Sequence, residues 1–503
     1  MLRYVNFPCK VSLLFLVCVA MRLCYAGRYL DCCDSVDFAL GLREYNINLL
    51  QPHFPGYPIY LFAAWLFSQI SLHTVWSLEM PGVLFGSLSV YPLAFLARKL
   101  FSERVALLAV ILFLINPLCW LQAERPTSDA MGLFFILSSA NILCGVSTLK
   151  SSLNQDSRWF EKGAHLLFLG SFVFSIGLGV RLSYFPFIAL VVYAVCEQVV
   201  QGRQSTSRAV FCGLAGFVSG VCLWLLPQIG LTGWRPLLHN GLLFSHGHFT
   251  DWGGSAFTFW GWKRIVCLAR SLWLYGLGGW WPGASLLSVS PSLAMLFGIF
   301  YAAKQRSTGR RYPGRFLAVY AVPYLFWLLI GQNVSNTRHV LPIIPVLLIL
   351  ISYGLCKAYK TGRRGISPAS LLIFALVINV FIVSYTVVTR YHNTIPAPVQ
   401  LIRFIEGHFD ATSTRIYCGE ERRFFDYYAP LWDAREVRNE SGLRNDMQSS
   451  LCNPETTLFI ITPENLENAL SKRLPLTSCN INPYLDGTKE ALALCMVSEV
   501  TPD

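Results

Sequence analysis

Long apolar runs separated by short polar turns fill the chain from residue 11 to residue 388. A helix of about 20 apolar residues matches the hydrocarbon thickness of a bilayer, so each such run predicts a membrane-spanning helix. A first span is expected over the run that begins at Val11. Ten more are expected at residues 76–97, 105–121, 129–148, 164–180, 182–199, 209–228, 283–303, 316–331, 340–356 and 367–388, which makes eleven.

Two further apolar stretches, at residues 57–72 and 265–281, are interpreted as helices that lie along the membrane surface. If residues 57–72 formed a span, every later basic turn would fall on the opposite side of the membrane. The second carries clustered Trp and Tyr, which anchor helices at the membrane interface. Both belong to long loops, 27–75 and 229–282, and long loops in a compact protein are usually functional.

Residues 389–503 have a different pattern, in which shorter apolar stretches alternate between helical and strand periodicity. Helices are expected at 399–408 and 463–470, and strands at 415–418 and 457–461. This order predicts a small α/β domain. The expected fold is therefore an all-α polytopic membrane domain, residues 1–388, followed by a small α/β domain, residues 389–503.

Composition supports a membrane protein. Hydrophobic residues make up 54% of the 503 residues and charged residues 14%, with a mean hydropathy of +0.47. Soluble chains carry roughly a quarter charged residues, so a soluble protein is excluded.

The charge distribution orients the expected spans. Residues 389–503 hold 11 basic and 16 acidic residues, which leaves 29 basic and 12 acidic residues for the membrane domain. Of these 29 cations, 19 fall in turns on one side, and cytoplasmic turns carry an excess of Lys and Arg. We therefore expect a cytoplasmic N-terminus and an extracytoplasmic C-terminal domain, in the inner membrane of a bacterium or the endoplasmic reticulum of a eukaryote. Nucleic acid is not expected as a partner, because the cations are confined to membrane turns.

No metal site is assigned from the sequence. The 16 cysteines include no Cys-x-x-Cys pair. His246, His248 and Asp251 supply three candidate ligands without a fourth at a fixed spacing, so we interpret them as polar or acceptor-binding residues.

The first long loop holds the candidate general base. Asp34 and Asp37 are three residues apart and so share one face of a helix, and His53 follows in a Pro/Gly-rich segment that returns to the membrane. Partial burial beside an apolar wall makes a carboxylate more basic, as acid/base chemistry requires. The alternative is a structural role, in which Asp34 caps a helix that starts at Ser35 and Asp37 is favoured by the helix dipole.

At these residues the sequence resembles the GT-C superfamily of integral membrane glycosyltransferases, in particular the protein O-mannosyltransferases and aminoarabinose transferases. The first outer loop of that family carries an acidic motif and a Pro-rich entry into a surface helix, matched here by Asp34-Ser-Val-Asp37-Phe38 and His53-Phe-Pro-Gly-Tyr-Pro58. Further matches are Arg98-Lys-Leu-Phe101, Glu124-Arg-Pro-Thr-Ser-Asp129 and Thr337-Arg-His-Val-Leu-Pro342. Where the family often has an Asp-Glu pair this chain has Asp34-Ser35, so the base is either Asp34 or Asp37.

The resemblance implies a glycosyltransferase that moves a sugar, mannose or a related hexose or pentose, from a polyprenyl- or dolichyl-phosphate carrier with inversion at the anomeric carbon. The acceptor would be a protein or a glycolipid on the outer face, and the loop aspartate would deprotonate its hydroxyl. Membrane lipids and the lipid-phosphate-linked donor are the expected partners, and a divalent metal is not expected.

The leaving lipid phosphate needs cationic partners, and arginine suits it because its planar fork donates two parallel hydrogen bonds. The candidate residues for binding the donor are His53, Glu124, Asp129, Arg181, Lys263, Arg264, Arg338 and His339. Cations at the ends of spans also snorkel to lipid headgroups without any further role. Capping of a helix that begins near Ser128 is the corresponding alternative for Asp129.

A second class of function, a transporter or flippase for a lipid-linked glycan, would also have many spans and aromatic outer loops. Transporters place ionisable residues near the bilayer midplane on broken helices, often in repeated halves. Here the acids gather at one face and no internal repeat is evident. The sequence therefore favours the enzyme.

Overall fold

The computed structural model describes residues 6–148, 157–200, 204–304, 311–361, 368–436, 457–463, 473–480 and 491–497. Within these ranges, ten helical segments are long and apolar enough to cross a membrane, and a bent pair of helices makes an eleventh. Each coincides with an expected span, which confirms the polytopic helical fold. The helices that form these segments are α1 (Phe7–Cys24), α4 with α5 (Thr74–Leu88, Val90–Leu100), α6 with α7 (Glu103–Leu114, Pro117–Ala123), α8 (Asp129–Thr148), α9 (Ser157–Val180), η3 with α10 (Leu182–Phe187, Ile188–Val200), α11 (Thr206–Thr232), η5 with α14 (Leu286–Ser288, Val289–Lys304), α15 (Arg311–Gly331), η7 with α16 (Thr337–Ile343, Ile344–Thr361) and α17 (Pro368–Asn393).

The third span is bent rather than straight. Helices α6 and α7 meet at an angle of 60°. Asn116 sits at the break, where its side chain accepts a hydrogen bond from the Cys119 N–H at 2.9 Å and donates one to the Gly276 carbonyl at 2.8 Å. Pro117 follows and has no N–H to continue the ladder of α6, so the chain starts a new, capped helix in a new direction.

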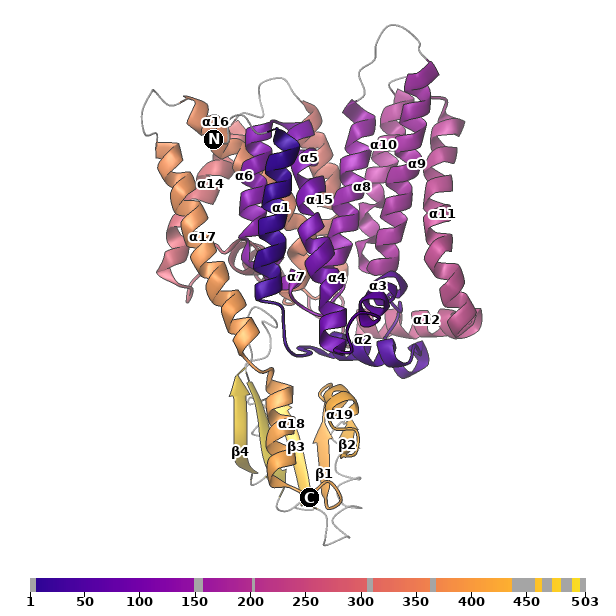
Figure 1. Cartoon of the computed structure of the whole chain (residues 1–503), viewed down its shortest axis with the longest axis vertical. Helices are drawn as coiled ribbons and strands as arrows, with labels where there is room; N and C mark the ends of the chain where they lie inside the picture. Colours follow the sequence, from indigo (N-terminus) through magenta and orange to yellow (C-terminus); the bar gives the residue numbers. More distant parts are fainter. Residues whose placement is uncertain are drawn as a thin grey trace.

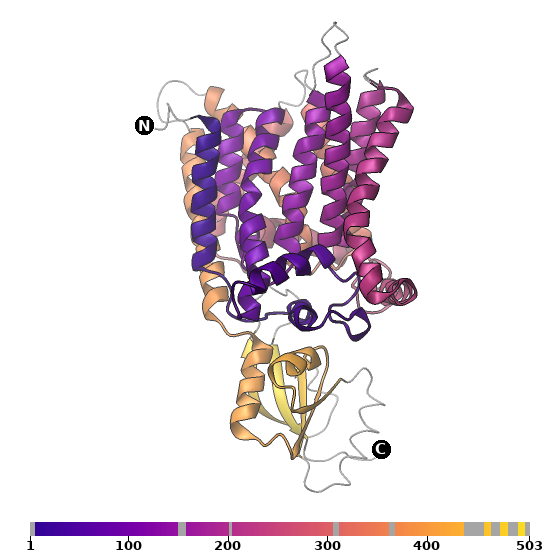
Figure 2. The same ribbon diagram turned by 45° about the vertical axis from the view of Figure 1, so that its right-hand side comes forward.

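One end of the bundle is covered by short helices from the two long loops. Helices α2 (Cys33–Arg43), α3 (Pro58–Ser68) and α12 (Trp234–Thr250) lie across the end nearest the C-terminal sheet (Figures 1 and 2). We call this the domain-facing end. Helix α3 is apolar but too short to count as a span, as expected for residues 57–72. In the other expected surface stretch, α13 (Trp262–Arg270) is followed by a π-helical turn, η4 (Ser271–Gly276).

The turn into α3 depends on a glycine. Gly56 has a φ of 89°, a conformation that favours glycine. A Cβ at Gly56 would also overlap the Tyr45 hydroxyl and the Gln228 amide. A small 3₁₀ turn, η2 (Ile47–Leu49), precedes this segment.

The C-terminal residues form the expected α/β domain. Its five-stranded sheet has the order β2-β1-β3-β5-β4, in which β1 is parallel to β2 and β3 while β5 is antiparallel to β3 and β4. The elements are α18 (Ala397–His408), β1 (Thr414–Cys418), α19 (Arg422–Tyr428), β2 (Asp433–Glu436), β3 (Thr457–Pro463), β4 (Arg473–Asn480) and β5 (Ala491–Val497). The helix expected up to residue 470 lies, beyond Pro463, outside the described residues.

The C-terminal domain packs against the loop that carries α2. One buried apolar cluster includes Val36 and Phe38 of α2 together with Ile402 of α18 and Phe424 of α19. The Leu30 N–H donates a hydrogen bond to the Tyr428 hydroxyl at 3.1 Å. This contact fixes α19 beside α2.

Candidate active site

Helix α2 places two carboxylates at the domain-facing end. Its N-terminus is closed by Ser35, whose hydroxyl accepts hydrogen bonds from the N–H groups of Asp31 at 3.0 Å and Cys32 at 3.1 Å. Asp34 lies inside the first turn and not at the capping position, which Cys32 occupies. The carboxylates of Asp34 and Asp37 are therefore left to other partners.

Asp34 pairs with Arg338, with 2.7 Å between Oδ2 and Nη1. Arg338 lies on η7, and the Tyr324 hydroxyl holds that turn by donating to the His339 carbonyl at 2.9 Å. The Asp34 side chain is 24% exposed and the Arg338 side chain 12%. The buried Nε–H of Arg338 has no hydrogen-bond acceptor among the described residues. The guanidinium thus keeps hydrogen-bonding capacity beyond its ion pair with Asp34.

The charges around Asp34 keep it ionised. Burial by itself would raise the pKa of the Asp34 carboxyl. The charges of Arg338, His53 and Arg181, of which Arg338 contributes most, together outweigh this effect and hold the pKa of Asp34 well below its usual range. Asp34 is therefore a carboxylate at neutral pH.

Asp37 is the more enclosed carboxylate, with a side chain 8% exposed. Its Oδ2 lies 2.9 Å from Nδ1 of His53, and its Oδ1 accepts a hydrogen bond from Nε of Arg423 at 2.8 Å. Arg423 comes from α19 and also donates to the Leu50 carbonyl at 2.6 Å. Both oxygens of Asp37 are thus occupied by protein partners.

His53 connects the carboxylates to an aromatic wall. Its ring stacks on Phe244 of α12 at a centroid distance of 5.6 Å, and its Nε2 lies 3.0 Å from the Tyr57 hydroxyl. Burial alone would lower the pKa of His53, but the Asp34 and Asp37 carboxylates raise it above its ordinary value. The two carboxylates thus stabilise the imidazolium form of His53.

A second cation stands beside the first pair. Arg181, at the turn between α9 and η3, lies 3.2 Å from Oδ1 of the fully buried Asp129 and donates to the Ser128 hydroxyl at 3.3 Å. Its charge also lowers the pKa of Asp34. The structure thus brings Asp34, Asp37, His53, Asp129, Arg181 and Arg338 together from five parts of the chain.

Glu124 lies in a neighbouring cluster instead. It accepts a hydrogen bond from the Trp120 indole at 2.5 Å, and near it Arg125 pairs with Asp31 at 2.5 Å. Burial raises the pKa of Glu124 well above its usual range, with the Trp120 hydrogen bond opposing this. No contact in the described part of the chain joins Glu124 to Asp34 or Arg338.

The other candidate cations are placed differently. Lys263 is exposed. Arg264 is fully buried and donates to backbone carbonyls, including those of Leu329 and Gln332 at 2.5 Å. It therefore connects α13 to the C-terminal end of α15. His339 adjoins Arg338, and its Nδ1 lies 2.8 Å from the Asn333 carbonyl.

Of the candidate metal ligands on α12, His248 contacts the backbone at the end of α15. Nε2 of His248 lies 2.6 Å from the Gly331 carbonyl. In the described ranges, no group of three His, Cys, Asp or Glu side chains is close enough to hold a metal ion. The thiol of Cys32 is also not a candidate nucleophile, because burial, and next to it the Asp31 charge, raise its pKa to about 12.

Two residues of this cluster are absent from the sequence-based candidates. Tyr57 lies four residues after His53. Its contact with His53 depends on the turn at Gly56, which the residue spacing alone does not predict. Arg423 lies in the C-terminal domain, and nothing in its local sequence distinguishes it from Arg422.

No protein-family model matches the sequence, and no curated protein matches it significantly. Solved structures share its fold. The archaeal oligosaccharyltransferase AglB from Archaeoglobus fulgidus, in complex with an inhibitory peptide and a dolichol-phosphate, superimposes with a TM-score of 0.55 at 12% identity, over 92% of this chain and 70% of that chain.

Two bacterial structures give similar superpositions. ArnT from Cupriavidus metallidurans, bound to undecaprenyl phosphate, matches with a TM-score of 0.52 at 14% identity, over 99% of this chain and 98% of that chain. The arabinofuranosyltransferase AftD from Mycobacteria matches with a TM-score of 0.51 at 12% identity, over 97% of this chain but 40% of that chain. The chain therefore shares the fold of these three transferase structures, which is the fold that the resemblance seen in the sequence implies.

Proposed function

We propose that this protein transfers a sugar from a polyprenyl- or dolichyl-phosphate carrier to an acceptor hydroxyl at the domain-facing end of the bundle. The Asp34–Arg338 pair carries this proposal. It sets an ionised carboxylate against a largely buried guanidinium at the end of a membrane-embedded bundle. These are the two groups that the reaction requires, a base for the acceptor and a partner for the phosphate.

The donor phosphate is the natural acceptor for the unpaired side of Arg338. Its buried Nε–H points to a further ligand, and a phosphate oxygen accepts from a guanidinium in a bidentate manner. When phosphate takes over part of the guanidinium, the hold of Arg338 on Asp34 weakens and the carboxylate becomes a stronger base. Donor binding would thus prepare the site for catalysis.

The reaction then needs one displacement. The acceptor oxygen attacks the anomeric carbon as its proton passes to the Asp34 carboxylate, and the bond from that carbon to the phosphate oxygen breaks. The lipid phosphate leaves with the electron pair, stabilised by Arg338 and the nearby Arg181. A single displacement inverts the anomeric carbon. Asp37 is a positioning residue in this scheme, because His53 and Arg423 occupy both of its oxygens.

Two solved structures of the same fold support a lipid-phosphate donor, since one is in complex with a dolichol-phosphate and the other is bound to undecaprenyl phosphate. Mannose or a related hexose or pentose is the proposed sugar, and a protein or glycolipid is the proposed acceptor. The transporter alternative receives no support from the site, because its charges gather at one end of the bundle.

Replacement of the proposed base tests the function. We expect Asp34→Asn to lower turnover by about 10²-fold or more, the usual scale for loss of a general base. The assay measures the release of lipid phosphate from a panel of polyprenyl-phosphate sugars by the purified protein in lipid. Asp37→Asn is expected to lower turnover less, because Asp37 acts through its partners.

Glu406→Gln is the matched control, because Glu406 is an exposed acid of α18 at the same end of the molecule. It should leave turnover unchanged. A near-normal rate in correctly folded Asp34→Asn would show that Asp34 is not the base.

A further inference from the structure

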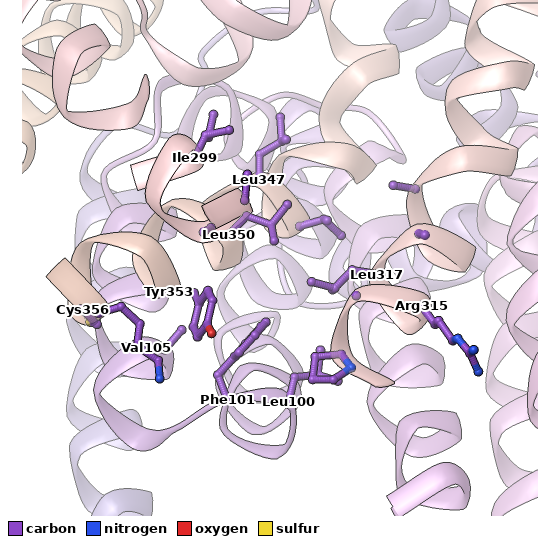
Figure 3. A pocket seen from close by; sticks show the side chains of 18 of the residues that line it. Leu100, Phe101, Val105, Ile299, Arg315, Leu317, Leu347, Leu350, Tyr353 and Cys356 are labelled. Atoms are coloured by element: carbon purple, nitrogen blue, oxygen red, sulfur yellow. The ribbon is translucent and has the colours of Figure 1, made fainter. Parts of the chain in front are cut away.

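One cavity of the described structure is far from the carboxylates. It has a volume of about 1000 Å³ and lies between the turn that joins α5 to α6 and the helices α14, α15 and α16 (Figure 3). Its lining includes residues from the last turns of α14 and α16 and from the first turn of α15. These turns are at the end of the bundle opposite to the C-terminal domain (Figure 1). The cavity is therefore separate from the candidate active site.

The cavity is not filled because α14 and α16 pack against each other, while α15 packs mainly against other helices. Helices α14 and α16 touch backbone to backbone, since a Cβ at Gly354 would overlap the Gly298 carbonyl oxygen. Helix α15 packs against α10 and η3 instead. The face that α15 turns to the cavity includes Ala318 and Ala321, whose small side chains do not fill the gap.

The inner wall is apolar, and the depth suits a lipid chain. Ile299, Leu317, Leu347 and Leu350 line it (Figure 3). Along α16 the lining runs from Val346 to Lys357, which at 1.5 Å per residue is about 16 Å. That length is about half of the roughly 30 Å hydrocarbon core, so the cavity is one leaflet deep.

Three cations are among the residues that line the cavity. Arg104, Arg315 and Lys357 belong to the lining, and none of the lining residues is acidic. Arg104 and Arg315 are exposed at helix ends. The neighbouring acid, Glu103, is paired with Lys10 at 3.1 Å. An apolar slot one leaflet deep below three cations complements a molecule with an acyl chain and an anionic headgroup.

We propose that this cavity binds an anionic phospholipid from the leaflet at that end of the bundle. One acyl chain lies between α14, α15 and α16, and the headgroup phosphate is held by Arg104, Arg315 and Lys357. Basic pockets between membrane helices bind anionic headgroups in this way. The inference does not depend on the proposed transferase activity, because the two sites are at opposite ends of the bundle.

Photocrosslinking tests the proposal with the full-length protein in phosphatidylcholine vesicles that contain a photoactivatable phosphatidylglycerol. The labelled peptides should come from α14, α15 and α16 at this end. The double variant Arg315→Gln/Lys357→Gln should reduce their labelling by about 10-fold or more, since each cation near the surface contributes about a factor of five. Ala318→Trp, which fills the cavity, should reduce labelling as well.

Two controls separate the cavity from general attraction to the membrane. Arg208→Gln removes an exposed cation on α11 at the same end, and Val322→Trp adds bulk at a position of α15 that is 60% exposed. Both should label like the wild type. Equal labelling in all variants would overturn the proposal. So would equal labelling by a phosphatidylcholine probe, or more effective competition by polyprenyl phosphate than by phosphatidylglycerol.

Discussion

A carboxylate and a guanidinium that face each other in a partly buried site depend on each other. Removing one partner of such a pair leaves the other charge uncompensated, which costs more than the pair itself contributes. For Asp34 and Arg338 this means that any variant must be judged by donor dependence as well as by rate. In the proposed reaction Arg338 also binds the phosphate through its Nε–H, which has no acceptor among the described residues.

Arg338 variants should separate charge from geometry. Arg338→Ala is expected to weaken donor use strongly, because charge-assisted hydrogen bonds are worth about 1.5–3 kcal/mol each. Arg338→Lys keeps the charge but loses the planar fork, so it should restore only part of the activity. The measurement is transfer rate against donor concentration. Arg235→Ala, which removes an exposed arginine of α12, serves as the control.

Full activity in Arg338→Lys would indicate a simple headgroup anchor. An unchanged donor dependence in Arg338→Ala would remove this residue from the phosphate site.

His53 should make the stability of the protein depend on pH. The carboxylates of Asp34 and Asp37 outweigh burial and raise its pKa in the folded state, while the unfolded value is about 6.5. A raised pKa gives a stabilising contribution that is complete below about pH 6.5 and is lost as pH rises through the folded value. The difference in melting temperature between wild type and His53→Gln should therefore shrink from pH 6 towards pH 9.

His408→Gln, at an exposed histidine of α18, should show no such trend. A difference between wild type and His53→Gln that stays constant with pH would mean that the charge of His53 does not contribute.

At the residue scale, the sequence identifies the chemical groups but not their partners. Asp34, Asp37 and Arg338 can each be singled out because acids and cations are rare next to apolar spans. Their pairing depends on how η7 is placed relative to α2, which follows from the packing of many helices. Arg423 is missed for the same reason, because its importance arises only when α19 docks on α2.

At the scale of elements, α19 links the C-terminal domain to the site. Arg423 and Arg422 are adjacent, yet only Arg423 reaches Asp37 and the Leu50 carbonyl. Arg422 is 40% exposed and pairs with Asp426 at 2.8 Å within its own helix. Exposed pairs of this kind contribute at most about 1 kcal/mol. The two arginines therefore form a matched pair for testing the docking.

We expect Arg423→Ala to lower turnover by about 10-fold or more, since it removes charge-assisted hydrogen bonds to Asp37. It should also speed hydrogen exchange in α19 and in the turn at Leu50, because the docking contact is lost. Arg422→Ala should change neither quantity. Identical behaviour of the two variants would show that Arg423 is an ordinary surface residue.

The spans illustrate why some element boundaries can be predicted and others cannot. Apolar length alone locates each crossing, since backbone groups in a bilayer must be satisfied within a helix. The bend between α6 and α7 is not evident from apolar length. It depends on Asn116 bonding to the Gly276 carbonyl, a contact between distant segments, although Asn-Pro is a local signal for a new helix start.

At the scale of the whole molecule, the positions of charge and domain combine into one prediction of orientation. Eleven crossings in the described part of the chain place the N-terminus and the C-terminal domain on opposite sides, and the last turns of α5, α14 and α16, which carry basic residues, are at the end away from the C-terminal domain (Figure 1). The positive-inside rule predicts that this end is cytoplasmic. Reporter fusions at Lys304 and Lys357 should therefore be active in the cytoplasm, and a fusion at Pro430 should be active only outside it. Activity of the Pro430 fusion in the cytoplasm would show that the orientation is the reverse of the predicted one. The proposed transfer reaction would then lie on the cytoplasmic face, which would contradict the proposal.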